Sequence, residues 1–393
     1  MEYPELVRID TDGSRQTTSY HCAPPRALAW RHLRARAAAT GTIVMVNFTI
    51  LAGGYTSFVA SYLFNSDTNA LTLLNQSPTG PNPSWISLLP HKHILYAINE
   101  DSPGGLQSFR IGENGLLSSA IDTINAEGNT SAFTAPLSTG QVAVVNYGSG
   151  NALIVSTEES DPAQFTTEYS LITFDAPVSN PHMVLEHGSE VFIPDLGADK
   201  IWRLAESDTP GNWKVQGQID QPTGSGPRHI VTRGNTLYTV HQTSNTLTQQ
   251  RIPPAPNGTS TPLIANISIL PPGLPEGAAM AGAEVLLAER SEHYAESFIY
   301  VSNRNTGVQD PRGDAIAIFR VEPRLSLVGF VYTGLQQVRG MQLGGPEKEF
   351  LIAGGVAGDA GVIMLKRTEG GRNLTLLARN AEIPTRASFV WLD

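Results

Sequence analysis

The chain has 393 residues, of which 40% are hydrophobic and 16% charged, and this composition excludes an intrinsically disordered protein. Its formal net charge of -10 argues against a nucleic acid or an anionic membrane surface as a partner. No apolar run approaches the roughly 18 residues that a membrane-spanning helix needs. The 37 Gly and 27 Pro suit many short strands joined by tight turns.

Residues 1–44 differ from the rest of the chain. They contain the only cysteine, Cys22, and an arginine-rich stretch without acidic residues at 26–36, but no alternating strand pattern. The interpretation we favour is a disordered extension, or one that precedes a natural start at Met45. The protein is then expected in the cytoplasm. The alternative is a mitochondrial transit segment, which would also be rich in arginine and poor in acids.

From Met45 onward one unit of short strands recurs about every 50 residues, which is in the range for a four-stranded propeller blade. The unit is an apolar strand, a tight turn, a second strand that ends in a small or polar residue, and a third strand. Its six copies have their second strands at 94–100, 141–147, 191–197, 236–242, 298–304 and 350–355.

Strands at both ends of this body remain outside the six copies, at 48–54, 60–64 and 388–392. If they join, they make a seventh blade whose innermost strand is C-terminal, and this closure removes the exposed edges of an open sheet. The sequence therefore predicts an all-β fold, a seven-bladed β-propeller over residues 45–393. The Gly-His and Trp-Asp signatures of a WD40 propeller are missing, and a two-domain sandwich would not explain the persistent repeat.

Several motifs in this order resemble the seven-bladed propeller lactonases, a family that includes propeller 6-phosphogluconolactonases and carboxy-cis,cis-muconate lactonising enzymes. The motifs are Asn82-Pro-Ser-Trp85, Tyr96-Ala-Ile-Asn-Glu100, Asn180-Pro-His182, Pro194-Asp-Leu-Gly-Ala-Asp199, Gly226-Pro-Arg-His229 and Tyr300-Val-Ser-Asn-Arg304. The resemblance implies an enzyme that hydrolyses a lactone ring, or that forms or isomerises one reversibly. It spans essentially the whole body of the chain.

Blades converge on the ring axis, so residues at the starts of innermost strands can face one another across the channel. His182, Arg228 and Glu284 hold such positions, Arg339 opens a later strand, and Arg304 follows a second strand. Guanidinium groups close to one axis repel each other unless an anion joins them, and arginine binds carboxylate or phosphate through paired hydrogen bonds. We therefore expect a pocket for an anionic small molecule.

The resemblance implies a role for each candidate residue. His182 would be the general acid/base at the lactone ring, and Arg228 and Arg304 would bind anionic groups and stabilise the oxyanion. Glu284, Arg339 and His229 are expected to complete the substrate-binding set.

One position departs from the family pattern, because Gln242 stands where relatives often have glutamate after the second strand. Glutamine cannot transfer a proton near neutral pH. Gln242 therefore either changes the catalytic chemistry or disables it. Its neighbour His241 is expected to point the other way because side chains alternate along a strand.

We expect no cofactor and no metal, because the candidate positions offer more arginine than carboxylate and would repel a hard cation. We further expect a monomer or a weak oligomer. The alternative to an enzyme is a propeller of the same descent that has lost catalysis and binds a ligand or a protein. Gln242 and a stretch rich in proline and glycine at 253–280 motivate this second hypothesis.

Overall fold

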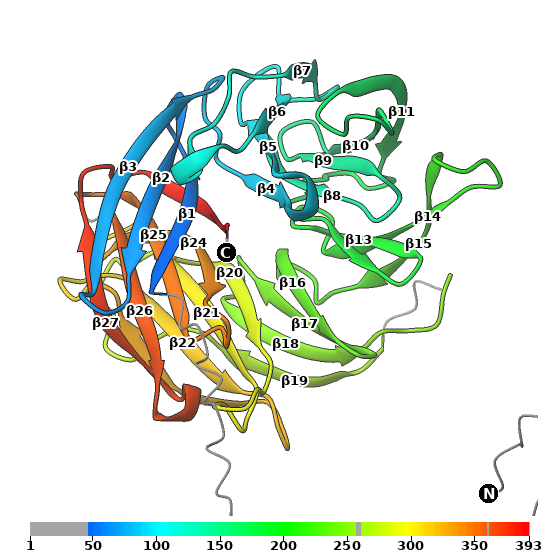
Figure 1. The fold of residues 1–393 in the computed structure, drawn as a ribbon. Coiled ribbons are helices and arrows are strands. Elements are labelled where there is room, and N and C mark those ends of the chain that lie inside the picture. The colour runs from blue at the N-terminus through cyan, green and yellow to red at the C-terminus, as the bar shows by residue number, and fades with distance from the viewer. Residues whose placement is uncertain (1–45, 257–260, 360, 393) are drawn as a thin grey trace, which may run out of the picture. The chain divides into compact units, whose positions relative to one another are not determined.

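The computed structural model describes residues 46–256, 261–359 and 361–392, and the expectations for residues 1–44 lie outside this range. The described residues form seven antiparallel sheets of four strands each, arranged as blades around a common centre (Figure 1). Three short 3-10 turns lie in the connections: η1 (Pro90–Lys92), η2 (Glu113–Gly115) and η3 (Glu369–Gly371). No helix among the described residues is long and apolar enough to cross a membrane. The predicted seven-bladed β-propeller is confirmed.

Six of the seven blades run from an innermost strand to an outermost one in chain order, and in the remaining blade the innermost strand is the C-terminal β28 (Arg386–Trp391). The first four, from inside outward, are β28 (Arg386–Trp391), β1 (Asn47–Gly54), β2 (Phe58–Asn65), β3 (Ala70–Pro78); β4 (Ile86–Leu89), β5 (Ile94–Asn99), β6 (Gly105–Arg110), β7 (Asp122–Asn125); β8 (Ser131–Pro136), β9 (Gln141–Asn146), β10 (Asn151–Thr157), β11 (Phe165–Thr173); β12 (Leu185–His187), β13 (Glu190–Asp195), β14 (Lys200–Glu206), β15 (Trp213–Asp220). The last three are β16 (Pro227–Arg233), β17 (Thr236–His241), β18 (Thr246–Arg251), β19 (Leu263–Ser268); β20 (Met280–Ala288), β21 (Phe298–Asn305), β22 (Ala315–Arg320), β23 (Ser326–Tyr332); β24 (Gln336–Gly344), β25 (Phe350–Ala357), β26 (Val362–Thr368), β27 (Asn373–Asn380).

One blade is shared by the two ends of the described chain, as the leftover strands predict. The C-terminal strand β28 pairs antiparallel with β1, with Leu51 opposite Val390 and Ala52 opposite Phe389. The rings of Phe48 and Trp391 pack edge to face at 5.7 Å, and Phe48 also contacts Phe350 of the preceding blade. Aromatic side chains bury large apolar areas, so this contact fastens the closure of the ring.

The cores of the propeller lie between neighbouring blades. The second and third strands are buried on both faces, because each sheet packs against another sheet on either side. One such core joins Phe298, Tyr300 and Ile318 of one blade to Leu351 and Ile363 of the next. Near-continuous runs of Val, Ile, Leu and aromatic residues in these strands follow from this double burial.

Four details of the strand prediction change. Arg304 lies inside β21 instead of following it, and Arg339 lies within β24 instead of at its start. His182 precedes β12 and is next to an isolated bridge between Pro181 and Asp195. The stretch 253–280 includes the outermost strand β19, so part of the expected insertion is a regular element of its blade.

Candidate functional site

Two arginines from adjacent blades meet at one glutamine. Arg228 is the second residue of β16, and Arg304 lies near the end of β21 in the following blade. Gln242 comes directly after β17, and its Oε1 accepts hydrogen bonds from Arg304 Nη2 at 2.6 Å and Arg228 Nη1 at 3.4 Å. A neutral oxygen therefore lies between the two guanidinium groups.

The backbone around this contact is fixed by a glycine and by hydrogen bonds. Gly226 has a φ of +65°, a conformation that L side chains rarely adopt, and a Cβ there would lie 2.5 Å from Thr243 Oγ1. Its carbonyl accepts the N–H of Gln242 at 2.7 Å, and the Gln242 carbonyl accepts the N–H of Gly282 at 3.2 Å. Gly226 thus turns the chain into β16 and places Arg228 beside Gln242.

The site concentrates positive charge that protein carboxylates only partly neutralise. Arg228 and Arg304 are 2% and 8% exposed, and no carboxylate of the described residues pairs with either one. Burial and the charges of Arg304 and Arg339 lower the pKa of Arg228 well below its usual value. Burial and Arg339 lower the pKa of Arg304 to about 10. Arginine nevertheless keeps its charge near neutral pH, so the site favours an anion.

His182 contacts Arg228 and begins a chain of buried polar groups. Its Nε2 accepts a hydrogen bond from Arg228 Nη1, and its Nδ1 lies 3.2 Å from Nε2 of His229. His229 Nδ1 lies 2.8 Å from Oε1 of Glu284. Burial and then the charge of Arg228 lower the pKa of His182 well below its usual value, so His182 is neutral near pH 7 and can act as a base.

His229 and Glu284 lie behind His182. His229 is fully buried, and protein groups occupy both of its ring nitrogens. Glu284 is 4% exposed. The expected part of His229 and Glu284 in substrate binding stays a prediction.

Arg339, Glu100 and two tyrosines also belong to the site. Arg339 Nη2 lies 3.5 Å from Glu100 Oε1, and the Tyr55 hydroxyl donates to Glu100 Oε2 at 3.0 Å. The Tyr147 ring packs edge-on to His182 at 5.8 Å. The Arg339 side chain is 20% exposed, so solvent reaches this part of the site.

The sequence analysis missed Tyr55 and Tyr147, although a repeat signal marks them. Glu100, Tyr147 and Gln242 each follow the second strand of a blade, and each donates its N–H to a carbonyl just before the innermost strand, at 3.0, 2.9 and 2.7 Å. Tyr55 directly follows β1 in the same way. The residue that follows the second strand therefore belongs to the site in several blades. Its position in the repeat is the signal that identifies it.

Other polar residues singled out by the sequence maintain the backbone. Asp195 accepts hydrogen bonds from the N–H groups of Asn180, Gly197 and Ala198. Asp199 accepts those of Gly224 and Gly226 at 2.6 and 2.8 Å. His241 bonds Thr248 Oγ1 at 2.9 Å inside its own sheet, and burial lowers its pKa to about 4. Its position agrees with the alternation expected for β17.

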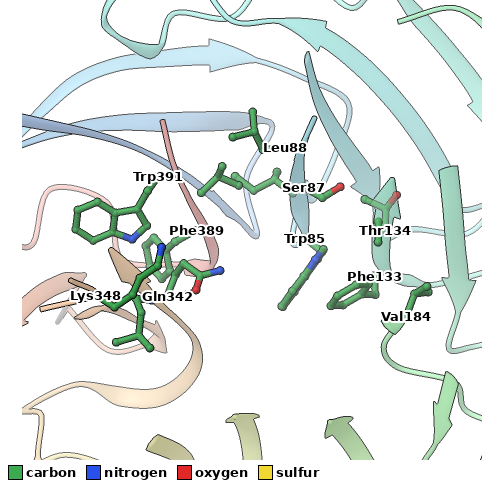
Figure 2. A pocket seen from close by; sticks show the side chains of 14 residues that line it. Trp85, Ser87, Leu88, Phe133, Thr134, Val184, Gln342, Lys348, Phe389 and Trp391 are labelled. Carbon is green, nitrogen blue, oxygen red and sulfur yellow. Dashed lines mark hydrogen bonds between the residues drawn. The ribbon is translucent and has the colours of Figure 1, made fainter. Parts of the chain in front are cut away.

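A cavity of about 370 Å³ lies beyond an aromatic pair at the centre of the ring. Figure 2 shows Trp85 and Phe133 on one side of it and Phe389 and Trp391 on the other. Trp85 stacks on Phe133 at 4.2 Å, and both rings pack edge-on to His229. The candidate arginines do not line this cavity, so the aromatic pair and His229 lie between it and the arginines.

Acidic, histidine and cysteine side chains do not gather in groups of three or more that could hold a metal ion anywhere in residues 46–256, 261–359 and 361–392. The hydrogen-bond donors that converge at the site are the guanidinium groups of Arg228, Arg304 and Arg339. These suit the oxygens of an anion or a polarised carbonyl.

All seven blades contribute to this site or to the layer directly behind it, and together they define a seven-bladed β-propeller with a cationic centre. The sequence matches the family described as "Lactonase, 7-bladed beta-propeller" over residues 49–391. The chain belongs to this family. No curated protein sequence matches the chain.

Solved structures share the fold at low sequence identity. A Lactobacillus plantarum protein is 20% identical with a TM-score of 0.75, covering 88% of this chain and 100% of that one. A putative 6-phosphogluconolactonase from Bacteroides fragilis is 18% identical with a TM-score of 0.72, covering 90% and 99%. A periplasmic gluconolactonase from Pseudomonas aeruginosa is 18% identical with a TM-score of 0.73, covering 88% and 99%. At these identities the likeness concerns the fold.

Proposed function

We propose that the protein hydrolyses the lactone ring of a small molecule that carries an anionic group. The observation that carries this proposal is the pair Arg228 and Arg304, buried and held together by one neutral oxygen of Gln242. A third guanidinium, Arg339, has a 3.5 Å contact to Glu100 and lies 5.3 Å from the centre of the Tyr55 ring. Membership in the lactonase family supports the reaction class, and the excess of guanidinium over carboxylate supports the charge of the substrate.

Each side chain has a separate role in substrate binding or catalysis. Arg304 and Arg339 bind the anionic group, since guanidinium forms paired hydrogen bonds with carboxylate and phosphate. Arg228 donates to the lactone carbonyl oxygen, which becomes negative as water adds to the carbonyl carbon. His182 takes a proton from that water through Nε2 and returns it to the ring oxygen when the carbon–oxygen bond of the ring breaks.

Gln242 holds the two guanidinium groups and takes no proton. The family glutamate that it replaces would have paired with Arg228 and Arg304 and reduced their attraction for an anion. In this proposal His182 is therefore the only general base at the reacting carbon. The positive charge that glutamate would have neutralised stays available for the substrate.

The experiment compares glucono-δ-lactone with its 6-phosphate, a neutral and an anionic lactone with the same ring. We expect hydrolysis of the phosphorylated lactone, with kcat/KM reduced about 10²–10⁴-fold by His182→Gln. Arg304→Met should raise KM most strongly for the phosphorylated lactone. Arg251→Met removes an exposed arginine outside the site and serves as the matched control. Equal activity of wild type and His182→Gln on a turned-over lactone would contradict the assignment.

A second candidate function is ligand binding without turnover, and the glutamine at position 242 favours it. A propeller that only binds would be stabilised against heat by the phosphorylated lactone or its ring-opened acid, with no product formed. Thermal unfolding and product formation, measured on the same samples, separate the two functions.

A further inference from the structure

The buried chain Arg228–His182–His229–Glu284 has only one direction in which its hydrogen bonds can run. An arginine can only donate, and an ionised carboxylate can only accept. Arg228 therefore donates to Nε2 of His182, and His229 Nδ1 donates to Glu284 Oε1 at 2.8 Å. His229 Nε2 is left to accept, so the 3.2 Å contact between the histidines is donated by His182 Nδ1.

These bonds fix the tautomer of the candidate base. Both histidines carry their proton on Nδ1, so Nε2 holds the only lone pair of the His182 ring. Arg228 Nη1 occupies that lone pair. With His182 3% exposed and Arg228 2% exposed, the base cannot reach a water molecule while Arg228 stays in place.

We propose that Glu284 and His229 act as positioning residues that keep the proton on Nδ1 of His182, and that Arg228 blocks Nε2 until an anion draws the guanidinium away. This inference rests on the proposed function and deepens it. The anionic group of the substrate is then needed for turnover as well as for binding, and a neutral lactone leaves the base blocked.

The other contacts of Arg228 are weak enough for an anion to compete. Its Nε donates to the Ala283 carbonyl at 3.2 Å, and Nη1 reaches Gln242 Oε1 at 3.4 Å, both neutral acceptors. An anionic oxygen adds the attraction of a full opposite charge and can accept paired hydrogen bonds from a guanidinium, which a neutral imidazole or amide oxygen cannot do. An anion beside Arg304 therefore offers Arg228 a better partner than His182 does.

The chemical step balances without a further reactant. Once Nε2 is free, it takes a proton from water while the water oxygen bonds to the lactone carbonyl carbon. The imidazolium formed is stabilised by the hydrogen bond from His182 Nδ1 to His229, which Glu284 supports from behind. The ring carbon–oxygen bond breaks, and the proton passes from Nε2 to the departing oxygen.

The first test reads the tautomers by ¹⁵N NMR of the full-length protein, with His182→Gln and His229→Gln used to assign the signals. We expect both histidines to have a protonated Nδ1 and an unprotonated Nε2 at pH 7.5. Adding inorganic phosphate should shift the His182 Nε2 signal as Arg228 moves. A proton on Nε2 of His182, or a phosphate titration that leaves this signal unchanged, overturns the proposal. Neither reading depends on lactone turnover.

The second test is a matched pair of variants at position 229. In His229→Gln the amide oxygen can accept from His182 Nδ1 while the amide N–H₂ donates to Glu284, so the His182 tautomer should persist. In His229→Phe the ring packing on Trp85 and Phe133 persists but the acceptor is lost, so the Nδ1–H form should no longer dominate. His241→Gln, which changes a buried histidine outside the site, should leave the His182 signals unchanged. Identical His182 tautomers in the Gln and Phe variants refute the positioning role.

The third test uses the two lactones with the wild-type protein. We expect kcat for glucono-δ-lactone to be at least about 100-fold below that for its 6-phosphate, and inorganic phosphite to raise it at least about tenfold. Equal kcat values, or no activation by phosphite, overturn the blocking role of Arg228. If neither lactone is hydrolysed, the proposed function fails, while the NMR titration still decides whether an anion frees His182.

Discussion

Two buried arginines in neighbouring blades have opposite surroundings. Arg203 in β14 is 1% exposed and faces Glu190, which bonds its Nε at 2.8 Å and also contacts Nη2, while the Pro253 carbonyl accepts from Nη1 at 2.8 Å. Arg228 in β16 is 2% exposed and contacts an imidazole, an amide oxygen and one backbone carbonyl. The first arginine is neutralised within the protein, and the second is not.

A missing carboxylate alone does not make a site. Arg386 is fully buried and bonds the Ala52 carbonyl and Thr56 Oγ1. What distinguishes Arg228 is a second guanidinium, Arg304, on the same acceptor oxygen. Like charges gathered in a poorly solvated place raise the free energy of the folded state until an anion binds. The comparison thus separates an arginine whose charge is neutralised within the protein from the arginines that we propose as the ligand-binding groups.

The largest expected effect is on stability, in the pair Arg203→Met and Arg228→Met. Arg203→Met leaves Glu190 buried without its cation and should lower the free energy of unfolding by about 3–5 kcal/mol. Arg228→Met removes charge repulsion along with three hydrogen bonds to neutral acceptors, so the loss should be smaller, about 1–2 kcal/mol. Urea unfolding with Arg251→Met as the surface control measures both. Equal losses for the two variants would remove the distinction between the arginines.

The next effect is stabilisation by an added anion. Inorganic phosphate at a hundred times its Kd should raise the free energy of unfolding of the wild type by about 2.7 kcal/mol. Arg304→Met should lose this gain, whereas Arg203→Met should keep it even from a lower starting stability. Thermal unfolding against phosphate concentration gives the comparison, with sodium chloride at matched ionic strength as the control. A gain that Arg304→Met retains would place the anion elsewhere.

The fold was predictable from sequence because every blade repeats one strand pattern and the two ends supply the missing strands. The site was predictable in part. Arg228 and Arg304 could be identified because the candidate repeat positions contain more arginines than carboxylates, and the sequence alone shows this. The roles of His229 and Glu284 were not, because strand alternation shows which face a side chain occupies but not which partner it meets across a blade boundary. Tyr55 and Tyr147 stand out only when the residues that follow the second strands are aligned across blades, because neither side chain is charged and each motif alone gives no sign of the site.

A substitution of Gln242, whose side-chain oxygen accepts from both arginines, would give Arg228 a carboxylate partner like that of Arg203. Gln242→Glu puts a carboxylate between Arg228 and Arg304, as Glu190 stands beside Arg203. We expect the free energy of unfolding to rise by about 2 kcal/mol, the scale of hydrogen bonds to a charged group. Phosphate affinity should fall about tenfold because the site then supplies its own anion. Calorimetric titration measures the affinity, and an affinity equal to that of wild type would show that Gln242 does not set the charge of the site.

The smallest expected effect is a shift of the pH profile. It tests whether the positive charges of the arginines lower the pKa of His182. Burial and then Arg228, His229, Arg339 and Arg304 lower the pKa of His182 well below its usual value, so the neutral base persists as the pH falls below about 6.5. Removing one positive charge makes the imidazolium less unfavourable and raises this pKa. Activity would then be lost at a higher pH than in the wild type.

Arg304→Met should therefore move the acidic limb of kcat/KM to higher pH. Arg203→Met should leave the limb in place because its charge is already matched by Glu190. The measurement is the pH profile of kcat/KM with the phosphorylated lactone, normalised for each variant so that the limb is read independently of the rate. An acidic limb that stays at the same pH in Arg304→Met would mean that Arg304 does not alter the pKa of His182. The electrostatic role of the arginines would then be limited to binding the substrate.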